Sequence, residues 1–414
     1  MKNVYDLKKE HALDFILPKK DKLYGKCEIQ NFEKVVIVIH LFYLEKIPVY
    51  FEYIKNIPEE IQIIFTVSSM DAERILNSYL KGTSKKYKII VKRNRGRDIS
   101  ALLVAAREEL LKYEYVCFLH DKKEKSALTK KDVEHWEYCL WENTVGSREY
   151  IFNVLHLFAK NKGIGMLVPP IPISENMEYG YSNTWAKNFN SAKKIAKQFH
   201  LTCDLDETKT PIALGTVFWA RGAALNKIFM HKWEYEDFED EPLKDDGTLS
   251  HAIERLLPYV VQDSGYEIGW VMTDKYAAEN MEYFMDIFNI TFELIEKTYG
   301  LHHIAEIRNF LRLVKELSLF CKQFCNIYIY GAGGMGKKCF RILLNLGITP
   351  RGFLVTAKKN ESALLGVQIQ KIEDVPLDKN CGILVAVQEK YRREIEEELM
   401  ARRISSQNIF VFDE

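Results

Sequence analysis

Residues 34–40 read KVVIVIH, a run of β-branched side chains that ends at His40. A continuous apolar run of this length is typical of a strand that is buried on both faces of a parallel sheet. Alternating strands and helices predict an α/β fold with a doubly wound, mostly parallel sheet. Three comparable runs follow at 61–69, 86–94 and 113–120, and segments with helical spacing separate the strands at 43–56, 71–81 and 100–112.

The same alternation starts again near the end of the chain. Residues 325–347 read CNIYIYGAGGMGKKCFRILLNLG, which indicates a strand, a glycine turn and a helix. We therefore expect three parts: an α/β domain over 1–280, a helical connector over 281–325 and a small Rossmann-like α/β domain over 326–414. Further strands are expected at 163–170, 215–221, 351–355, 381–387 and 408–412, and further helices at 184–200, 222–230, 389–402 and from Thr248.

The charge balance limits the possible binding partners, and the cysteine pattern indicates the cellular compartment. Lysine and arginine together number 58, as do aspartate and glutamate, so no net charge favours nucleic acid. The eight cysteines form no C-x-x-C pair, which favours free thiols in a reducing compartment. The N-terminus has no apolar signal segment, and the most apolar run, 35–43, is too short to span a bilayer. We expect a cytoplasmic protein with no nucleic-acid partner.

Ligands of doubly wound sheets bind beyond the carboxyl ends of the strands, so the residues that follow each strand are site candidates. His40 ends the first strand, and NRGRD at 94–98 follows the third. Asn94 and Asp98 can hydrogen-bond a base or ribose, and Arg97 can contact phosphate. Asp98 could equally cap the next helix.

HDKK at 120–123 follows the fourth strand. His120, Lys122 and Lys123 are predicted to contact a diphosphate, because lysine can neutralise phosphate without a metal ion. Asp121 is the single acidic residue in this motif, so it is the candidate ligand for Mg²⁺ or Mn²⁺. A solvated run of charges is the alternative, but the position directly after a buried strand favours a ligand site.

An acidic loop, FEDEPLKDDG at 238–247, precedes the helix that starts near Thr248. A carboxylate here could take a proton from a substrate hydroxyl. Asp246 is the predicted catalytic base because Gly247 can turn the chain and aim it, and it could also only cap the helix. The alternative bases are Glu241, Glu239 and Asp245. The predicted pocket for the accepting substrate adds Trp219, Arg221, His251 and Arg255.

GAGGMG at 331–336 lies between a strand and a helix. Gly331, Gly333 and Gly336 match the G-x-G-x-x-G pattern, which places a phosphate at a helix N-terminus. The next strand ends in FLVT at 353–356, with no acidic residue to bind a ribose, and this disfavours NAD. The small domain therefore either binds a nucleotide or nucleotide-sugar, or serves as a docking module.

Six ordered motifs resemble the rhamnan synthesis F family of bacterial polysaccharide glycosyltransferases. The stretch that resembles the family runs from about residue 34 to 274, and the motifs in it are His40 with Tyr43, NRGRDI (94–99), LHDKK (119–123), GMLVPP (165–170), GTVFWAR (215–221) and DGTLSHAIERL (246–256). The resemblance implies a GT-A-like glycosyltransferase that moves L-rhamnose, with inversion, from dTDP-L-rhamnose to a growing cell-surface polysaccharide. The accepting substrate would be a glycan or lipid-linked glycan, and the protein would be peripheral at the inner face of the cell membrane.

Three questions stay open at this point. GT-A enzymes commonly carry Asp-x-Asp where this chain has His120, Asp121 and Lys122, so a requirement for Mg²⁺ or Mn²⁺ is in doubt. One alternative function is a Rossmann-type sugar-modifying enzyme in which the GAGGMG domain is catalytic. The other is a non-catalytic scaffold in a polysaccharide assembly complex.

Overall fold

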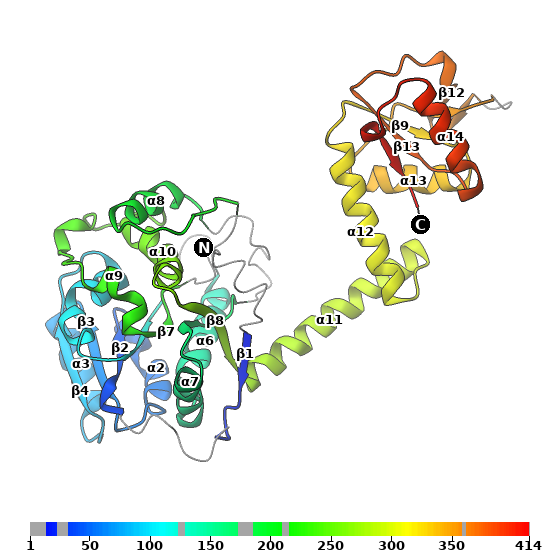
Figure 1. The fold of residues 1–414 in the computed structure, drawn as a ribbon. Helices are drawn as coiled ribbons and strands as arrows, with labels where there is room; N and C mark the ends of the chain where they lie inside the picture. The colour runs from blue at the N-terminus through cyan, green and yellow to red at the C-terminus, as the bar shows by residue number, and fades with distance from the viewer. Residues whose placement is uncertain are drawn as a thin grey trace. The chain divides into compact units, whose positions relative to one another are not determined.

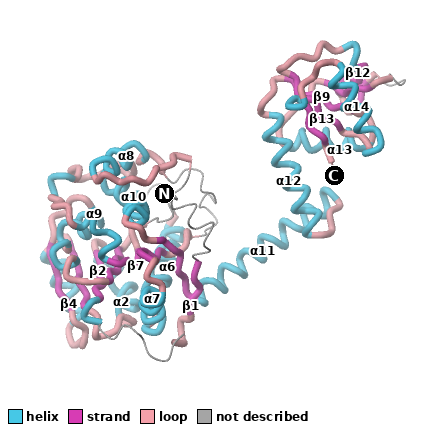
Figure 2. The backbone as a smooth tube through the Cα atoms, viewed as in Figure 1, coloured by secondary structure: helices cyan, strands magenta, loops and turns pink. Residues whose placement is uncertain are grey.

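The computed structural model describes residues 14–22, 32–122, 129–172, 185–208, 215–357 and 362–413. The chain forms two compact units, the first unit (Met1–Met285) and the second unit (Asp286–Glu414), which are described separately. Each contains a sheet and helices, so the expected α/β fold is confirmed (Figures 1 and 2). In the described part of the chain, no helix combines the length and apolar character needed to cross a bilayer.

An eight-stranded sheet forms the centre of the first unit, in the order β1-β8-β6-β7-β5-β2-β3-β4. Neighbouring strands are parallel except at β7, which is antiparallel to both β5 and β6. All strands expected in this part of the chain are confirmed. The bounds are β1 (Asp14–Leu17), β2 (Val35–His40), β3 (Gln62–Val67), β4 (Tyr87–Val91), β5 (Tyr115–His120), β6 (Ile164–Val168), β7 (Phe218–Arg221) and β8 (Glu267–Thr273).

Helices cover both faces of this sheet (Figure 1). The expected helix at 100–112 is three short pieces, because a π-helical turn, η3, interrupts it. One face carries α2 (Ile47–Ile54), α3 (Met70–Leu80), α6 (Lys130–Val145) and α7 (Arg148–Lys160). The other carries α4 (Arg97–Ser100), η3 (Ala101–Ala105), α5 (Arg107–Leu110), α8 (Phe189–Gln198), η4 (Gly222–Leu225), α9 (Asn226–Phe229) and α10 (Leu249–Asp263).

Strand β2 contributes side chains to the hydrophobic cores on both faces of the sheet. All six of its residues are buried. Val36 and Val38 belong to the core that contains α10, whereas Val35, Ile37 and Ile39 belong to the core that contains α6 and α7. Because side chains alternate along a strand, an uninterrupted apolar run is needed where both faces are covered.

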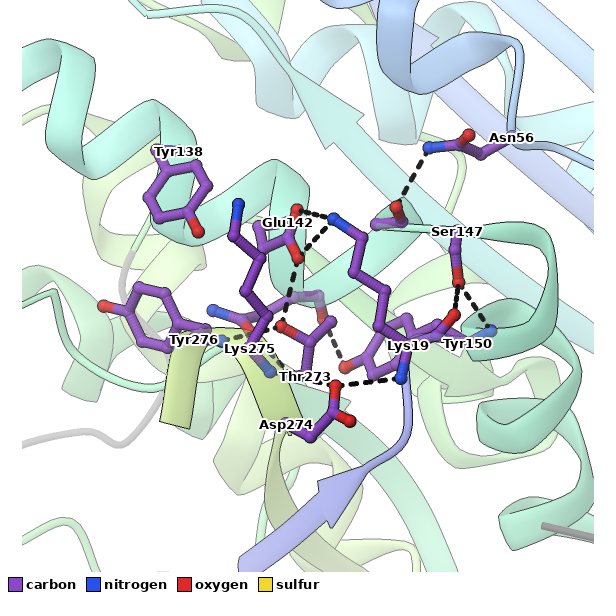
Figure 3. A network of polar contacts seen from close by, with 12 residues as sticks. Lys19, Asn56, Tyr138, Glu142, Ser147, Tyr150, Thr273, Asp274, Lys275 and Tyr276 are labelled. Atoms are coloured by element: carbon purple, nitrogen blue, oxygen red, sulfur yellow. Dashed lines mark hydrogen bonds and ion pairs between the residues drawn. The ribbon is translucent and has the colours of Figure 1, made fainter. Parts of the chain in front are cut away.

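A partly buried ion pair attaches the segment after β1 to α6. The sequence analysis does not predict β1 or β8, which pair in parallel at one edge of the sheet. Lys19 Nζ lies 2.7 Å from both carboxylate oxygens of Glu142, and the Thr273 hydroxyl donates to the same carboxylate at 3.1 Å (Figure 3). The backbone N–H of Lys19 also donates to Asp274 at 2.9 Å. These bonds tie the N-terminal segment to the end of β8.

The second unit contains a six-stranded sheet in the order β11-β12-β10-β9-β13-β14. All its strand pairs are parallel except β11 with β12. The sequence analysis predicts neither β11 nor β12. The strands are β9 (Asn326–Tyr330), β10 (Gly352–Val355), β11 (Ala363–Leu364), β12 (Val367–Lys371), β13 (Cys381–Val385) and β14 (Ile409–Val411), and the helices are α12 (Ile304–Cys321), α13 (Gly334–Asn345) and α14 (Glu389–Ala401). The expected helical connector corresponds to α11 (Asp274–Tyr299) and α12.

Removing the Lys19 ammonium should destabilise the first unit. In Lys19→Met, the Glu142 carboxylate would stay buried without its charged partner, and breaking such a pair costs about 3 kcal/mol of unfolding free energy. Tryptophan fluorescence during urea unfolding measures this unit alone, because all six tryptophans lie between residues 136 and 270. Lys20→Met, at an exposed neighbouring position, is the matched control. Identical unfolding curves for both variants would contradict the role of the ion pair.

Candidate active site

A cavity of about 460 Å³ lies at the carboxyl ends of the parallel strands of the first unit. His40 and His120 end β2 and β5, lie opposite each other in the sheet and both line the cavity. Lys123 falls outside the described residues. The predicted residues that line the cavity are His40, Asn94, Arg97, Asp98, His120, Asp121, Lys122, Glu241, Asp245, Asp246, His251 and Arg255.

A left-handed turn at Gly96 and Arg97 directs the arginine toward the start of α10. Gly96 has a φ of 73°, and an added Cβ would lie 2.6 Å from the Phe238 ring, so glycine is required. Arg97 has a φ of 49°, which is uncommon for a residue other than glycine. Its guanidinium lies 3.4 Å from His251 Nε2 and donates to the carbonyl oxygen of Lys244 at 3.1 Å.

Asp98 joins three segments at the floor of the cavity. Its Oδ2 lies 3.7 Å from His120 Nε2, and it accepts a hydrogen bond from the Thr216 side chain. Burial acts to raise the pKa of Asp98, but His120, Lys122 and the Thr216 hydrogen bond outweigh it and lower the pKa to about 2. The carboxylate is therefore ionised and paired. It does not cap α4, where Gly96 is the N-cap and no side-chain bond forms.

The sequence analysis does not predict Thr216 as a site residue, nor Glu254 as part of the site. Gly215 and Thr216 have φ values of 93° and 50°, and a left-handed β-branched residue is a true outlier. The turn is held by the Gly215 N–H, which donates to Glu254 Oε1 at 2.5 Å, and by its carbonyl oxygen, 2.6 Å from His120 Nε2. The available signal is the glycine that begins GTVFWAR, three residues before β7.

Asp121 anchors the loop that follows β2. Its Oδ2 accepts the backbone N–H groups of Phe42 and Tyr43 at 2.7 and 2.6 Å. Burial raises the pKa of Asp121 to about 7, although these two bonds act in the opposite direction. Among the described residues, no three His, Cys, Asp or Glu side chains are grouped so that they could hold a metal ion. The geometry of Asp121 therefore fits a loop anchor better than a metal ligand.

Lys122 stacks on an aromatic ring that the sequence analysis misses. Its ammonium lies 4.3 Å from the centroid of the Trp136 ring, within the range of a cation–π contact. Lys46 holds the backbone of Lys122 against α6. Its ammonium donates to Glu137 of α6 at 2.8 Å and to the Lys122 carbonyl oxygen at 2.7 Å. Nothing in the local sequence pairs Trp136 with Lys122, since thirteen residues separate them along the chain.

Two basic side chains are buried beside Asp98. His40 Nδ1 lies 3.0 Å from the Thr66 hydroxyl, and burial, with Lys92, lowers the pKa of His40 to about 3. His40 is therefore neutral and cannot add positive charge to a phosphate site. Lys92 follows β4 and is 4% exposed. Burial lowers its pKa to about 8, while Asp98 and Glu241 act to raise it.

The predicted base, Asp246, is hydrogen-bonded through both carboxylate oxygens. Oδ1 accepts from the Asn188 side chain at 2.7 Å, and Oδ2 accepts from the Lys187 backbone at 3.0 Å. Partial burial acts to raise the pKa of Asp246, but these bonds and Arg255 outweigh it and hold the pKa below its ordinary value. Arg255 lies 3.7 Å away. Asp246 does not cap α10, because Thr248 is the N-cap.

The alternative bases differ in position. Glu241 and Asp245 line the cavity, and Oε2 of Glu241 accepts the backbone N–H of Leu243 at 3.0 Å. Glu239 is not among the lining residues and accepts the backbone N–H of Leu249 at 2.9 Å. Glu239 therefore supports the first turn of α10 from outside the cavity.

Trp219 and Arg221 do not line the cavity, which corrects the predicted pocket. Strand β7 runs antiparallel to β5, so Arg221 lies opposite Tyr115 at the start of β5. This end of the strands is the one away from the cavity. Its guanidinium donates to the Ile164 carbonyl oxygen at 2.8 Å and to the Tyr115 hydroxyl at 3.0 Å. Trp219 is buried and donates to the Thr144 carbonyl oxygen at 3.0 Å. Both residues stabilise the core.

The glycine motif of the second unit lies between β9 and α13. Gly331 has a φ of 115°, and an added Cβ would lie 2.6 Å from the Ala386 carbonyl oxygen. A Cβ on Gly336 would lie 1.9 Å from the Gly331 carbonyl oxygen. Gly333 is the N-cap of α13, and a Cβ there would meet nothing within 4 Å. Packing thus explains Gly331 and Gly336, whereas Gly333 faces open space.

The sequence profile described as "Rhamnan synthesis protein F" matches residues 1–266, a range that includes every residue lining the cavity. The chain belongs to the rhamnan synthesis protein F family. The resemblance expected from the six motifs is thereby confirmed. Membership of the rhamnan synthesis protein F family associates the chain with the synthesis of rhamnan or a related polysaccharide.

Two similar proteins come from Xanthomonas campestris pv. campestris, strains B100 and ATCC 33913, and both carry the name "Uncharacterized protein WxcX". Each is 24% identical to the present chain over 233 residues. These residues are 56% of this chain and 32% of the relative. The chain thus spans about a third of the length of the curated relatives it matches.

The Asp98 network predicts a pH-dependent contribution to stability. In the folded protein the pKa of Asp98 is about 2, below the value of about 3.9 in an unfolded chain, so ionised Asp98 stabilises the fold above about pH 4. This contribution is lost as the pH falls from about 4 to 2. Urea unfolding should show Asp98→Asn to be less stable by about 2 kcal/mol at pH 7, with a smaller difference at pH 3. Asp71→Asn, an exposed change on α3, is the control, and a difference that does not depend on pH would contradict the pairing.

Proposed function

We propose that the first unit is a GT-A-like glycosyltransferase that moves L-rhamnose from dTDP-L-rhamnose to a growing cell-surface glycan, with inversion. The observation that carries this proposal is the convergence of strand-end residues on one cavity. His120 and Lys122 lie at the end of β5 and Arg97 lies after β4, and all three line the same space of about 460 Å³. The family match supports polysaccharide synthesis as the setting.

The diphosphate would contact Lys122 and Arg97, two of the cationic side chains that line the cavity. Asp98 is already paired with His120 and Thr216, so its charge is directed at the protein. Cationic side chains held at a strand end can stabilise the negative charge that develops on a leaving diphosphate. The glycan or lipid-linked glycan would enter from solvent at the membrane surface, where this protein would be peripheral.

Binding of the donor tests the proposal directly. Lys122→Ala should weaken the binding of dTDP and dTDP-L-rhamnose about tenfold or more, because a charge-assisted hydrogen bond to phosphate contributes about 1.5–3 kcal/mol. Titration calorimetry on the full chain measures the change, and Lys81→Ala, at an exposed position after α3, is the matched control. Equal affinities for the parent and Lys122→Ala would place the diphosphate elsewhere.

Chelation tests the metal requirement. Asp121 uses one oxygen to hold the Phe42 and Tyr43 amides, and a lone carboxylate is a poor site for Mg²⁺ or Mn²⁺, which prefer several oxygen ligands. We therefore expect transfer from dTDP-L-rhamnose to persist, at least in part, after treatment with EDTA. Complete loss of transfer that Mn²⁺ restores would make Asp121 a metal ligand.

A further inference from the structure

Two aromatic side chains from the loop after β2, Phe42 and Tyr43, line the cavity. Phe42 is 42% exposed, although large apolar side chains are usually buried. The two rings meet edge to face, with their centroids 5.1 Å apart and their planes at 80°. A contact of this kind covers at most one face of the Phe42 ring. Apolar ring surface is therefore open at the cavity, as in many ligand sites.

The backbone that carries these two rings is fixed by one buried carboxylate. Asp121 is 5% exposed, and its Oδ2 accepts the N–H groups of Phe42 and Tyr43 at 2.7 and 2.6 Å. The preceding residue, Leu41, donates its N–H to the Thr66 carbonyl oxygen at 3.0 Å. A ring on a backbone held in this way is already ordered, so a ligand that packs on it pays little for ordering the loop.

The acidic loop supplies a carboxylate to the same cavity. Oε2 of Glu241 accepts the Leu243 N–H at 3.0 Å, and its Oε1 has no hydrogen-bond partner among the described residues. Burial is the main cause that raises the pKa of Tyr43, with smaller contributions from the charges of Asp121 and Glu241, while Arg97 acts to lower it. The Tyr43 ring is therefore close enough to the acidic loop for the two to contact one ligand.

The lining residues indicate a ligand that is rich in hydrogen-bond donors. Carboxylates only accept hydrogen bonds when they are ionised. A sugar offers several hydroxyl donors and no charge, whereas a base such as thymine offers a single N–H. A pyranose ring also carries C–H groups on its faces, which can pack against an aromatic ring. The carboxylates that line the cavity belong to Asp98, Asp121, Glu241, Asp245, Asp246 and Glu254.

On the basis of the proposed glycosyl transfer, we propose that Phe42 and Tyr43 form a subsite that binds a pyranose ring. The ring faces pack on the aromatic side chains, and Glu241 accepts hydrogen bonds from the hydroxyls at the ring edge. The sugar has two possible sources, the rhamnosyl group of the donor and the terminal sugar of the accepting glycan, and both present this chemistry.

Binding to the full chain tests the subsite without relying on turnover. Phe42→Ala removes the ring but keeps the backbone N–H that Asp121 binds. Its affinity for dTDP, measured by titration calorimetry, should stay within about twofold of the parent's, which also shows that the variant is folded. Binding of dTDP-L-rhamnose should weaken about three- to tenfold if the donor sugar packs on the ring. Binding of a rhamnose trisaccharide, measured by ligand-observed NMR, should weaken similarly if the accepting glycan does.

Two further variants serve as controls. Phe42→Trp keeps an aromatic face, so it should bind the same probes within about twofold of the parent. Tyr87→Ala removes an aromatic ring of similar exposure, 38%, from β4, and Tyr87 is not among the residues that line the cavity. This matched control should bind all three probes like the parent.

The other outcomes separate the subsite from the proposed function. Equal weakening of dTDP and dTDP-L-rhamnose in Phe42→Ala would show that the ring contacts the nucleotide, and would overturn the sugar subsite. Unchanged affinities for all three probes would overturn it as well, as would a parent that binds neither sugar probe. A parent that binds the trisaccharide through Phe42 but transfers no rhamnose would overturn the proposed function and support the subsite.

Discussion

A largely buried carboxylate has to be paired, and at Asp98 this requirement organises the cavity of the first unit. Its partners come from two segments: His120 ends β5 with Lys122 just after it, and Thr216 precedes β7. Thr216 makes its contact from a left-handed backbone, and Arg97, next to Asp98, adopts another. Such conformations cost free energy, and they persist because the surrounding contacts over-determine them.

The sequence predicts well which residues lie at the carboxyl ends of the parallel strands. Uninterrupted apolar runs identify buried strands, and parallel strands end at one edge, so His40, Asn94 and His120 all line the cavity as expected. The direction of β7 cannot be predicted in this way, because a short apolar run looks the same in either direction. Trp219 and Arg221 are therefore expected at the cavity but lie in the core.

The roles of single acidic residues depend on partners that sequence spacing does not reveal. Asp246 precedes a glycine in an acidic loop, which suits a base, yet its carboxylate bonds Asn188, 58 residues away. Asp121 has the position of a metal ligand, yet it holds the amides of Phe42 and Tyr43. The ring of His251 contacts Arg97, 154 residues away. Position along the chain indicates which residues reach the site, whereas three-dimensional contacts decide what each can do there.

In the sheet of the first unit, the antiparallel direction of β7 places both ends of the connection that precedes it at the cavity. Strand β6 ends and β7 begins at the cavity edge, so the connection over residues 169–217 leaves and rejoins the sheet on the same side. Lys187 and Asn188 lie in that connection and reach Asp246. A change in this connection outside α8 and Thr216 therefore alters the contacts of Asp246 without altering a strand pairing.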